Sequence, residues 1–485
     1  MRLRELIAGL EIDRIWGSDD VEIRGIEEDS RRVKPGYLFV ALRGEKFDGH
    51  SFLQEAVNKG ARCVAVEKRL VMERTVTLQV PDTRKFLSFV SSRFYGEPQK
   101  SLNIIGITGT NGKTTISYLI KGILDRAGEK AGRIGTINYE WMKKVSLSSY
   151  TTPQPLELFA LLSSMVKEGV RFLVMEVSSH SLVLHRVDPL KFSSAIFTNL
   201  TRDHLDFHSS FESYFQAKLR LLGLIKEEGK VITNIDDEYF RKIPRIYSGR
   251  VITYGKDREA DYWIEDWESS WEGIRMRIGG KGGGREIFLS LPGSFNLYNA
   301  LSAITWAREE GYSWEVIRDA FQDISPVPGR FERLNHHGIN VVVDYAHTPD
   351  ALSKVLRSVK ELTRGRVITV FGCGGNRDKS KRPFMGWVAE TLSDWVIVTS
   401  DNPRQEDPEK IIQDILQGMS KDNHEVEIDR KEAIRRGIEK AEEGDTVLIA
   451  GKGHESYQCI GNTRIPFEDR RIAEIYLKEK GEVRV

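Results

Sequence analysis

The stretch Gly-Thr-Asn-Gly-Lys-Thr-Thr, residues 109–115, places two glycines, a lysine and several hydroxyl groups between two apolar runs. Glycines allow backbone N–H groups to approach an anion, a following helix would direct its N-terminus at that anion, and Lys113 adds positive charge. Thr114 supplies a hydroxyl where a magnesium ion bound to phosphates would lie. Ile107 stands where the usual phosphate-loop pattern has its first glycine. The stretch therefore predicts a shorter variant of a nucleotide-binding loop; the alternative is a turn that only tightens a strand–helix junction.

Two further segments could supply metal ligands at strand ends. Glu176 lies in the apolar run FLVMEVSSH, where an unpaired carboxylate would be costly. The segment TNLTRDHLDFH follows another apolar run and contains Asp203, His204, Asp206 and His208. Taken alone, each has an ordinary explanation: a glutamate paired with an arginine, or histidines on a solvated loop. With a phosphate loop they predict a magnesium–phosphate site, since magnesium prefers few carboxylates plus substrate oxygens.

The elements around these residues alternate between strand and helix. After the loop, apolar residues at Ile116, Leu119, Ile120, Ile123 and Leu124 share one helical face, and Gly128 is a natural stop. Strand-like runs then follow in FLVMEVSS, SAIFTNL and KVITNID. This alternation predicts a largely parallel sheet with helices on its faces.

Two breaks in composition divide the chain. Short strand-like runs fill residues 1–98 before the linker-like YGEPQKSLN, and ISPVPGRFERL forms a second break. After it, INVVVDYAH, RVITVFGCGG, DWVIVTSDN and DTVLIAGKGH each end in a polar or glycine-rich turn, as in an open α/β sheet whose ligands lie at the carboxyl edge. We therefore predict an α/β protein of three domains, 1–98, 99–328 and 329–485.

Composition limits the location and the partners. The net charge is only +1, so the protein has no overall positive field that would attract nucleic acid. The sequence has no run of about 18 apolar residues, so a membrane span is not expected. Glu5, Glu11 and Asp13 interrupt the apolar start, unlike a secretory signal. Three widely spaced cysteines fit a reducing compartment. A cytoplasmic enzyme is the expectation.

Seven motifs together resemble the Mur ligases, the ATP-dependent enzymes that build the peptide stem of bacterial cell-wall precursors. They are GTNGKTT at 109–115, EVSSH at 176–180, TNLTRDHLDFH at 198–208, YFQAK at 214–218, FNLYNALSA at 295–303, GRFE at 329–332 and DYAHTPDAL at 344–352. The resemblance covers essentially the whole chain in order. It implies a UDP-sugar domain, a central ATPase, a C-terminal Rossmann-like domain, a monomer, and a role in peptidoglycan synthesis and hence in cell shape and division.

Three C-terminal motifs narrow the resemblance. GCGGNRDKSKRPFM, SDNPR and AGKGHESYQ resemble the member that adds the third amino acid. The implied substrate is UDP-N-acetylmuramoyl-L-alanyl-D-glutamate. ATP would phosphorylate the D-glutamate carboxylate, and the amine of the incoming amino acid would attack the resulting acyl phosphate.

The resemblance assigns the nucleotide and magnesium contacts residue by residue. It implies phosphate binding by Gly109, Thr110, Asn111, Gly112, Lys113, Thr114 and Thr115, and magnesium coordination by Thr114, Glu176 and His204. Arg330 and Asp344 match positions that contact the phosphate and the ribose of ATP, and His347 is a weaker candidate. Asn296 and Asn299, which share a helical face, match an adenine-contacting pair; alternatively, Asn296 is only a helix cap.

Lys218 matches a lysine that carbon dioxide converts into a carbamate in this family. The carbamate would supply oxygen ligands to a second magnesium ion, and desolvation that lowers the lysine pKa would favour its formation. The alternative is an ordinary lysine whose ammonium reaches solvent. Lys113, Glu176, His204 and Lys218 are the implied catalytic residues.

The UDP-sugar contacts implied by the resemblance are Ser30, the loop RGEKFDGHSF, and a group formed by Thr151, Thr152, Ser178 and Arg186. The chain departs from the family at Tyr150, where many relatives have asparagine, and at Leu184, where some have glutamine.

The tetrapeptide Asp401-Asn402-Pro403-Arg404 bears on the amino acid that is added. Arginine matches a carboxylate bidentately and would repel the ammonium of lysine, whereas meso-diaminopimelate carries a carboxylate at that end. In the family this tetrapeptide accompanies diaminopimelate, and Arg377, Gly451 and Glu455 match the remaining contacts. The alternatives are a strand-terminating turn and a ligase that accepts L-lysine.

Other classes of protein compete with this interpretation. A folylpolyglutamate synthetase-like ligase shares the phosphate loop but lacks a domain like residues 1–98. A regulatory P-loop NTPase or kinase would hydrolyse nucleotide without an amino acid. A cell-wall scaffold without catalysis would not need Lys113, Glu176, His204 and Lys218.

Overall fold

The structure, a computed structural model, describes residues 1–44 and 47–482. Backbone contacts divide the chain into two compact units. The first unit comprises Met1–Thr108, Glu129–Ala195 and Ala217–Lys230, and the second comprises Gly109–Gly128, Ile196–Gln216 and Val231–Val485.

A small α/β layer opens the first unit. Its sheet has the order β1-β5-β4-β3-β2, with strands Arg14–Trp16, Val76–Gln79, Cys63–Val66, Tyr37–Val40 and Gly25–Glu27. All neighbours pair in parallel except β1 with β5. Buried residues pack on both faces of the sheet, around helices α1 (Leu3–Ile7), α2 (Leu53–Asn58) and α3 (Thr83–Phe94).

The first unit also holds one part of the central sheet, in the order β11-β6-β10-β7-β8-β9. These strands are β6 (Asn103–Thr108), β7 (Ala131–Ile134), β8 (Asn138–Trp141), β9 (Lys144–Leu147), β10 (Phe172–Glu176) and β11 (Phe192–Phe197). β10 pairs in parallel with both β6 and β7, whereas β8 and β9 form an antiparallel hairpin. Helices α5 (Pro155–Lys167) and α6 (Ser179–Val183) belong to this part.

The second unit holds the order β16-β15-β14-β13-β12, with strands β12 (Ile225–Asn234), β13 (Arg250–Gly255), β14 (Tyr262–Ser270), β15 (Gly273–Gly280) and β16 (Arg285–Leu289). Its helices here are α4 (Lys113–Arg126), α8 (Ile243–Ile246), α9 (Asn296–Glu309) and α10 (Trp314–Gln322). Strands β11 and β12 and helix α7 (Phe211–Leu219) have residues in both units. Residues 281–284 connect β15 with β16, and α4 ends before Gly128, as expected.

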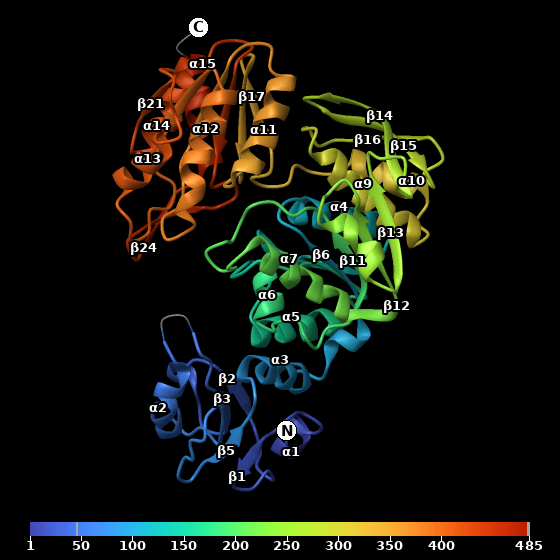
Figure 1. Ribbon diagram of the computed structural model, residues 1–485, viewed down its shortest axis with the longest axis vertical. Helices are drawn as coiled ribbons and strands as arrows, with labels where there is room; N and C mark the ends of the chain where they lie inside the picture. Colours follow the sequence, from blue (N-terminus) through green and yellow to red (C-terminus); the bar gives the residue numbers. More distant parts are fainter. Residues whose placement is uncertain (45–46, 483–485) are drawn as a thin grey trace. The chain divides into compact units, whose positions relative to one another are not determined.

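The C-terminal part of the second unit is a sheet with helices on both faces. Its order is β17-β18-β22-β19-β20-β21, with strands Glu332–His336, Ile339–Asp344, Thr446–Ala450, Val367–Phe371, Trp395–Val398 and His424–Val426. Val342, Leu448 and Val398 face a core with α11 (Pro349–Leu362), α12 (Arg382–Leu392) and α13 (Pro408–Leu416). Alternate residues of the same strands face α14 (Arg430–Lys440) and α15 (Asp469–Glu482). A hairpin of β23 (Tyr457–Ile460) and β24 (Thr463–Pro466) follows β22 (Figure 1).

The predicted α/β class, with a mainly parallel central sheet and a Rossmann-like C-terminal sheet, is confirmed. The three domains, 1–98, 99–328 and 329–485, stay a prediction. Within residues 1–44 and 47–482, no helix combines the length and apolar character needed to cross a bilayer.

Candidate functional site

The phosphate loop is shaped by its two glycines. Helix α4 begins at Lys113, and Gly112 precedes it with φ of 89°. A Cβ on Gly109 would lie 1.8 Å from the Thr198 hydroxyl oxygen, and one on Gly112 would lie 2.4 Å from Oδ1 of Asn299. Since both positions also have positive φ, only glycine lets the loop close against these neighbours.

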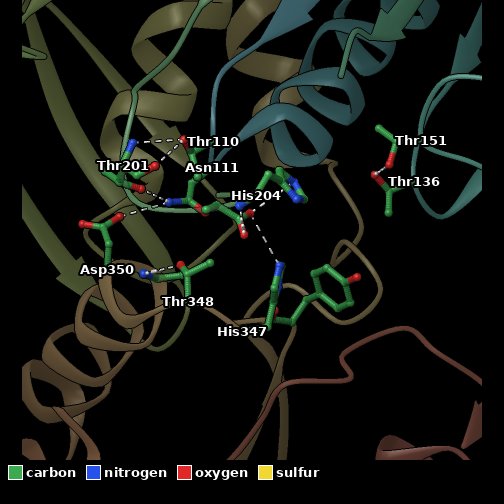
Figure 2. Close-up of polar contacts among 12 residues, drawn as sticks. Thr110, Asn111, Thr136, Thr151, Thr201, His204, His347, Thr348 and Asp350 are labelled. Carbon is green, nitrogen blue, oxygen red and sulfur yellow. Dashed lines mark hydrogen bonds and ion pairs between the residues drawn. The ribbon is translucent and has the colours of Figure 1, made fainter. Parts of the chain in front are cut away.

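The segment that follows β11 holds this loop in place. The Asn111 N–H donates to Oδ1 of Asn199 at 3.0 Å, and the Thr198 hydroxyl donates to the Asn111 carbonyl at 2.7 Å. The Thr201 N–H donates to the Thr110 hydroxyl oxygen at 3.0 Å (Figure 2). The motif TNLTRDHLDFH supported the resemblance, but its threonines and asparagine had no predicted role. Their position directly after a predicted strand was the only feature of the sequence that could have indicated a role in holding the loop.

Two cations lie at the loop and the start of α4. The Lys113 ammonium donates to the carbonyl oxygens of Gly109 and Thr110 at 2.9 and 2.8 Å. Arg330 donates to the Thr114 hydroxyl at 3.3 Å. The arrangement gives a phosphate group positive charge, a helix N-terminus and a hydroxyl in one place.

The predicted asparagine pair lies together in the first turn of α9. The Asn299 side-chain amide donates to Oδ1 of Asn296 at 2.8 Å, and both residues are buried. The alternative that Asn296 is a helix cap is wrong, because Phe295 occupies the cap and the Asn296 amide donates to the Pro292 carbonyl at 2.7 Å.

Asp344 ends β18 with both carboxylate oxygens in use. They accept the backbone N–H groups of Phe331 and Ala346, each at 2.7 Å. Burial raises the pKa of Asp344 to about 6, although the nearby Arg330 and the two backbone hydrogen bonds lower it. Its predicted contact with ribose would use the remaining lone pairs of these oxygens.

His347 and His204 face the same carboxylate. Nε2 of His204 lies 3.3 Å and Nε2 of His347 lies 3.8 Å from Oδ2 of Asp203 (Figure 2). Burial raises the pKa of Asp203, but the nearby His204, His347 and Lys381 and the His204 backbone N–H together hold this pKa below its usual range. Burial also lowers the pKa of His347. The structure thus brings the weaker candidate His347 beside the predicted magnesium ligand His204.

A contact that the sequence did not predict joins the loop to α11. The Asn111 side-chain amide donates to Oδ2 of Asp350 at 3.0 Å, and Thr348 caps α11 through the Ala351 N–H at 3.2 Å (Figure 2). Both residues come from the motif DYAHTPDAL, which carried no role for either of them.

In the first unit, Glu176 ends β10 with its side chain fully buried. Its carboxylate accepts the Thr136 N–H at 2.9 Å and the Thr136 hydroxyl at 3.0 Å. The hydroxyl oxygens of Thr136 and Thr151 lie 3.1 Å apart (Figure 2). The Thr152 hydroxyl donates to the Glu176 carbonyl at 2.8 Å. The threonine pair and the predicted metal ligand are therefore neighbours.

Ser178 and Arg186 join the same group. The Ser178 N–H donates to the Thr152 hydroxyl oxygen at 3.1 Å, and Arg186 donates to the Thr152 carbonyl at 2.9 Å. The Arg186 guanidinium also lies 5.0 Å from the centre of the Tyr150 ring, a contact that asparagine could not make. Leu184 follows the last residue of α6 as its cap.

The remaining predicted residues of this unit lie on other elements. Ser30 donates to Glu55 at 2.6 Å in the small α/β layer. In the loop RGEKFDGHSF, Glu45 and Lys46 lie outside the described residues. Lys218, near the end of α7, is 1% exposed, so the alternative of a lysine reaching solvent is wrong.

The residues predicted to bind the amino-acid substrate lie at the carboxyl edge of the C-terminal sheet. Asn402 donates from its side chain to Oε2 of Glu455 at 2.7 Å, and a Cβ on Gly451 would lie 2.6 Å from the Asp401 carboxylate. Arg404, with φ of 53°, donates to the Gly375 carbonyl at 2.7 Å. The side chain of Pro403 is buried, whereas that of Arg377 is exposed.

Glu406 fixes the loop that carries Arg377. Its carboxylate accepts the Asn376 N–H at 2.5 Å and two guanidinium nitrogens of the buried Arg382, each at 3.1 Å. Burial raises the pKa of Glu406, but the hydrogen bonds from Arg382 and the Asn376 amide outweigh burial and lower this pKa to about 2.

Glu406→Gln is expected to lower the free energy of unfolding at neutral pH by about 1–3 kcal/mol, because hydrogen bonds to a charged acceptor are lost. The folded pKa lies below the ordinary value of 4.5, so the stabilisation is complete above that pH and is lost as the pH falls toward 2. Urea denaturation at several pH values should show the difference between variant and natural protein shrink over this range. Glu409→Gln, at an exposed position of α13, is the control; an equal loss there, or a pH-independent difference, would contradict the assignment.

The donor set fits a magnesium-bound nucleotide. Within the described part of the chain, no three His, Cys, Asp or Glu side chains are grouped so as to hold a metal ion. Magnesium commonly takes only one or two protein ligands and completes its shell with phosphate oxygens and water. A glycine loop with Lys113 and the Thr114 hydroxyl at a helix start supplies the phosphate side of such a site.

Three family descriptions match successive parts of the chain. They are "Mur ligase family, catalytic domain" at residues 22–95, "Mur ligase middle domain" at 107–307 and "Mur ligase, glutamate ligase domain" at 329–453.

Curated relatives match along the full length. A UDP-N-acetylmuramoyl-L-alanyl-D-glutamate–2,6-diaminopimelate ligase of Clostridium botulinum is 45% identical over 487 residues, covering 99% of this chain and 100% of the relative. An enzyme of the same name from Aquifex aeolicus is 45% identical over 460 residues, covering 95% and 94%. A solved structure with that ligase name is 33% identical, has a TM-score of 0.70 and covers 99% of both chains. The chain therefore belongs to the Mur ligase family.

Proposed function

We propose that the chain is an ATP-dependent ligase that joins meso-diaminopimelate to the D-glutamate of UDP-N-acetylmuramoyl-L-alanyl-D-glutamate, in the cytoplasm and as a monomer. The observation that carries the proposal lies at the carboxyl edge of the C-terminal sheet, where Asn402 donates to Glu455 and Arg404, two residues further on, donates to the Gly375 carbonyl. A guanidinium and a carboxylate there suit an amino acid whose far end bears both a carboxylate and an ammonium. The full-length relatives with this ligase name support the same substrate.

The phosphate loop would hold the nucleotide. Lys113 and the amides of residues 109–115 bind the phosphates and neutralise charge that develops as the γ-phosphoryl group is transferred. Asn296 and Asn299 would contact adenine, Asp344 the ribose, and Arg330 a phosphate. Arg330 already reaches the start of α4 through the Thr114 hydroxyl, which favours this role.

The metal ligands are proposed from chemistry. Thr114, Glu176 and His204 would hold magnesium, and Lys218 as a carbamate would hold a second ion. Bound magnesium would draw negative charge from the phosphates as the transfer proceeds. Lys218 is buried, and the neutral amine of a lysine is the form that reacts with carbon dioxide.

The acceptor substrate would bind through Ser30, Thr151, Thr152, Ser178 and Arg186. The D-glutamate carboxylate attacks the γ-phosphorus, ADP leaves, and an acyl phosphate forms. The amine of diaminopimelate then attacks the acyl carbon, phosphate leaves, and the amine releases a proton. Arg377, Asp401, Pro403 and Gly451 would complete the amino-acid site.

Phosphate release with ATP, magnesium and the UDP-muramoyl dipeptide tests the function. Meso-diaminopimelate, L-lysine or neither is added as the third component. Release that depends on diaminopimelate is expected. Phosphate release that does not depend on an added amino acid would point to a regulatory NTPase instead. Equal rates with diaminopimelate and lysine would contradict the preference for diaminopimelate but not the ligase activity. A folylpolyglutamate synthetase-like activity is disfavoured by the Mur ligase match over residues 22–95.

Arg404→Met is expected to reduce the preference for diaminopimelate over lysine by about 10- to 100-fold, the value of hydrogen bonds to a charged group. The loss should lie in KM for diaminopimelate, with KM for ATP unchanged. Arg464→Met, at an exposed position of strand β24, is the control and should keep the preference. An unchanged ratio of kcat/KM values in Arg404→Met would exclude contact between this guanidinium and the far carboxylate.

A further inference from the structure

Lys452 is a fully buried lysine that follows β22 and has no role in the proposed reaction. Its ammonium donates to Oε2 of Glu455 at 2.9 Å and to Oδ1 of Asn402 at 3.2 Å. The Tyr457 ring lies against it, 5.6 Å from the ammonium to the ring centre. A buried charge is costly unless it is paired and hydrogen-bonded, so the burial of Lys452 depends on its contacts with Glu455 and Asn402.

The two oxygens of Glu455 are not equivalent. Oε2 accepts from both Lys452 and the Asn402 amide, at 2.9 and 2.7 Å. Among the residues that the structure describes, none donates a hydrogen bond to Oε1. Oε1 is therefore the oxygen that can accept from a ligand.

The orientation of Asn402 is fixed from the other side by the β23–β24 hairpin. Its Oδ1 accepts the Cys459 N–H at 2.8 Å as well as the Lys452 ammonium, so the amide nitrogen must point to Glu455. The same hairpin holds Arg404, whose N–H donates to the Cys459 carbonyl at 3.0 Å and whose carbonyl accepts the Gly461 N–H at 2.6 Å. Lys452, Asn402 and the hairpin thus link the carboxylate of Glu455 to the backbone of Arg404.

We propose that Lys452 is a positioning residue for amino-acid recognition: with Asn402 it holds Oε2 of Glu455 and leaves Oε1 for the side-chain ammonium of the substrate. This rests on the proposed function. Lys452 itself does not touch the ligand. Because diaminopimelate and lysine both carry that ammonium, loss of Lys452 weakens both equally, whereas loss of Arg404 weakens diaminopimelate alone.

A double-mutant cycle on the full chain tests the proposal. Lys452→Met is expected to raise KM about tenfold for both amino acids, because a hydrogen bond to a charged group commonly contributes about 1.5 kcal/mol or more. KM for ATP should stay unchanged and kcat should stay within about twofold. Lys452→Met in a Glu455→Gln background should have no further effect on KM, because the residue acts through Glu455.

The double variant also separates binding from folding, since it leaves no unpaired carboxylate. Arg366→Met is the matched control: Arg366 pairs with Asp445 at 2.9 Å, and these residues precede β19 and β22, at the opposite edge of the same sheet. It should lower the melting temperature without changing either KM. Independent effects of the two substitutions, or an unchanged KM in Lys452→Met, would overturn the inference alone. An unsubstituted chain indifferent to both amino acids would overturn the proposed function, and the inference with it.

Discussion

Replacing Lys113 by methionine is expected to slow ADP formation by about 1,000-fold, because removal of one charge-stabilising donor commonly costs 10²–10³ in rate, and the γ-phosphoryl transfer concentrates negative charge here. Methionine keeps the length and the apolar stem of the side chain. It removes only the ammonium, which lies against the Gly109 and Thr110 carbonyls. Single-turnover formation of ADP with all three substrates measures the effect.

Lys121→Met on the same helix is the control. Lys121 pairs with Asp125 of α4 at 2.6 Å and belongs to none of the proposed binding groups. It should keep nearly the full rate of ADP formation. A rate for Lys113→Met within tenfold of the unsubstituted chain would contradict the assignment of the phosphate loop.

Asp469→Asn is expected to cost about 3–5 kcal/mol of unfolding free energy, because it leaves a buried guanidinium without its counter-charge. Asp469 and Arg430 are both fully buried and form two hydrogen bonds, at 2.8 and 2.7 Å. Arg430 also donates to the Ala450 carbonyl at 3.0 Å, so the pair links the starts of α14 and α15 to the end of β22. Asparagine keeps the shape, removes the charge and leaves one acceptor oxygen in place of the two that Arg430 uses.

Denaturant unfolding measures this loss, and Glu474→Gln on α15 is its control. Glu474 pairs with Lys478 at 2.9 Å on the surface, where such pairs contribute about 0–1 kcal/mol. If the two substitutions cost the same, the buried pair does not hold α14 and α15 to the sheet.

Local chemistry in the sequence was enough to predict several elements. Gly112 followed by Lys113 and an apolar face predicted α4 with its start and stop, because caps and helical periodicity act over only a few residues. The turns after β18, β19, β20 and β22 predicted where ligand-binding residues gather, because carboxyl ends of parallel strands share one edge.

Other features depend on residues distant in sequence. Asn199 holds the phosphate loop from 88 positions away, and Asn402 meets Glu455 from 53 positions away. The buried Lys452 gave no sequence signal, because a lysine next to glycines is equally compatible with an exposed turn.

Turns, caps and apolar periodicity are local properties, so the α/β class, the glycine-rich loop and the side chains at strand ends could be predicted from the order of the amino acids alone. Contacts between distant parts of the chain settle which of those side chains become partners, that Oε2 of Glu455 accepts from Lys452 and Asn402, and that Lys218 is buried. Strands pair through backbone groups that are alike in every residue, so the order of strands, and the contacts it creates, follows from the packing of the whole sheet.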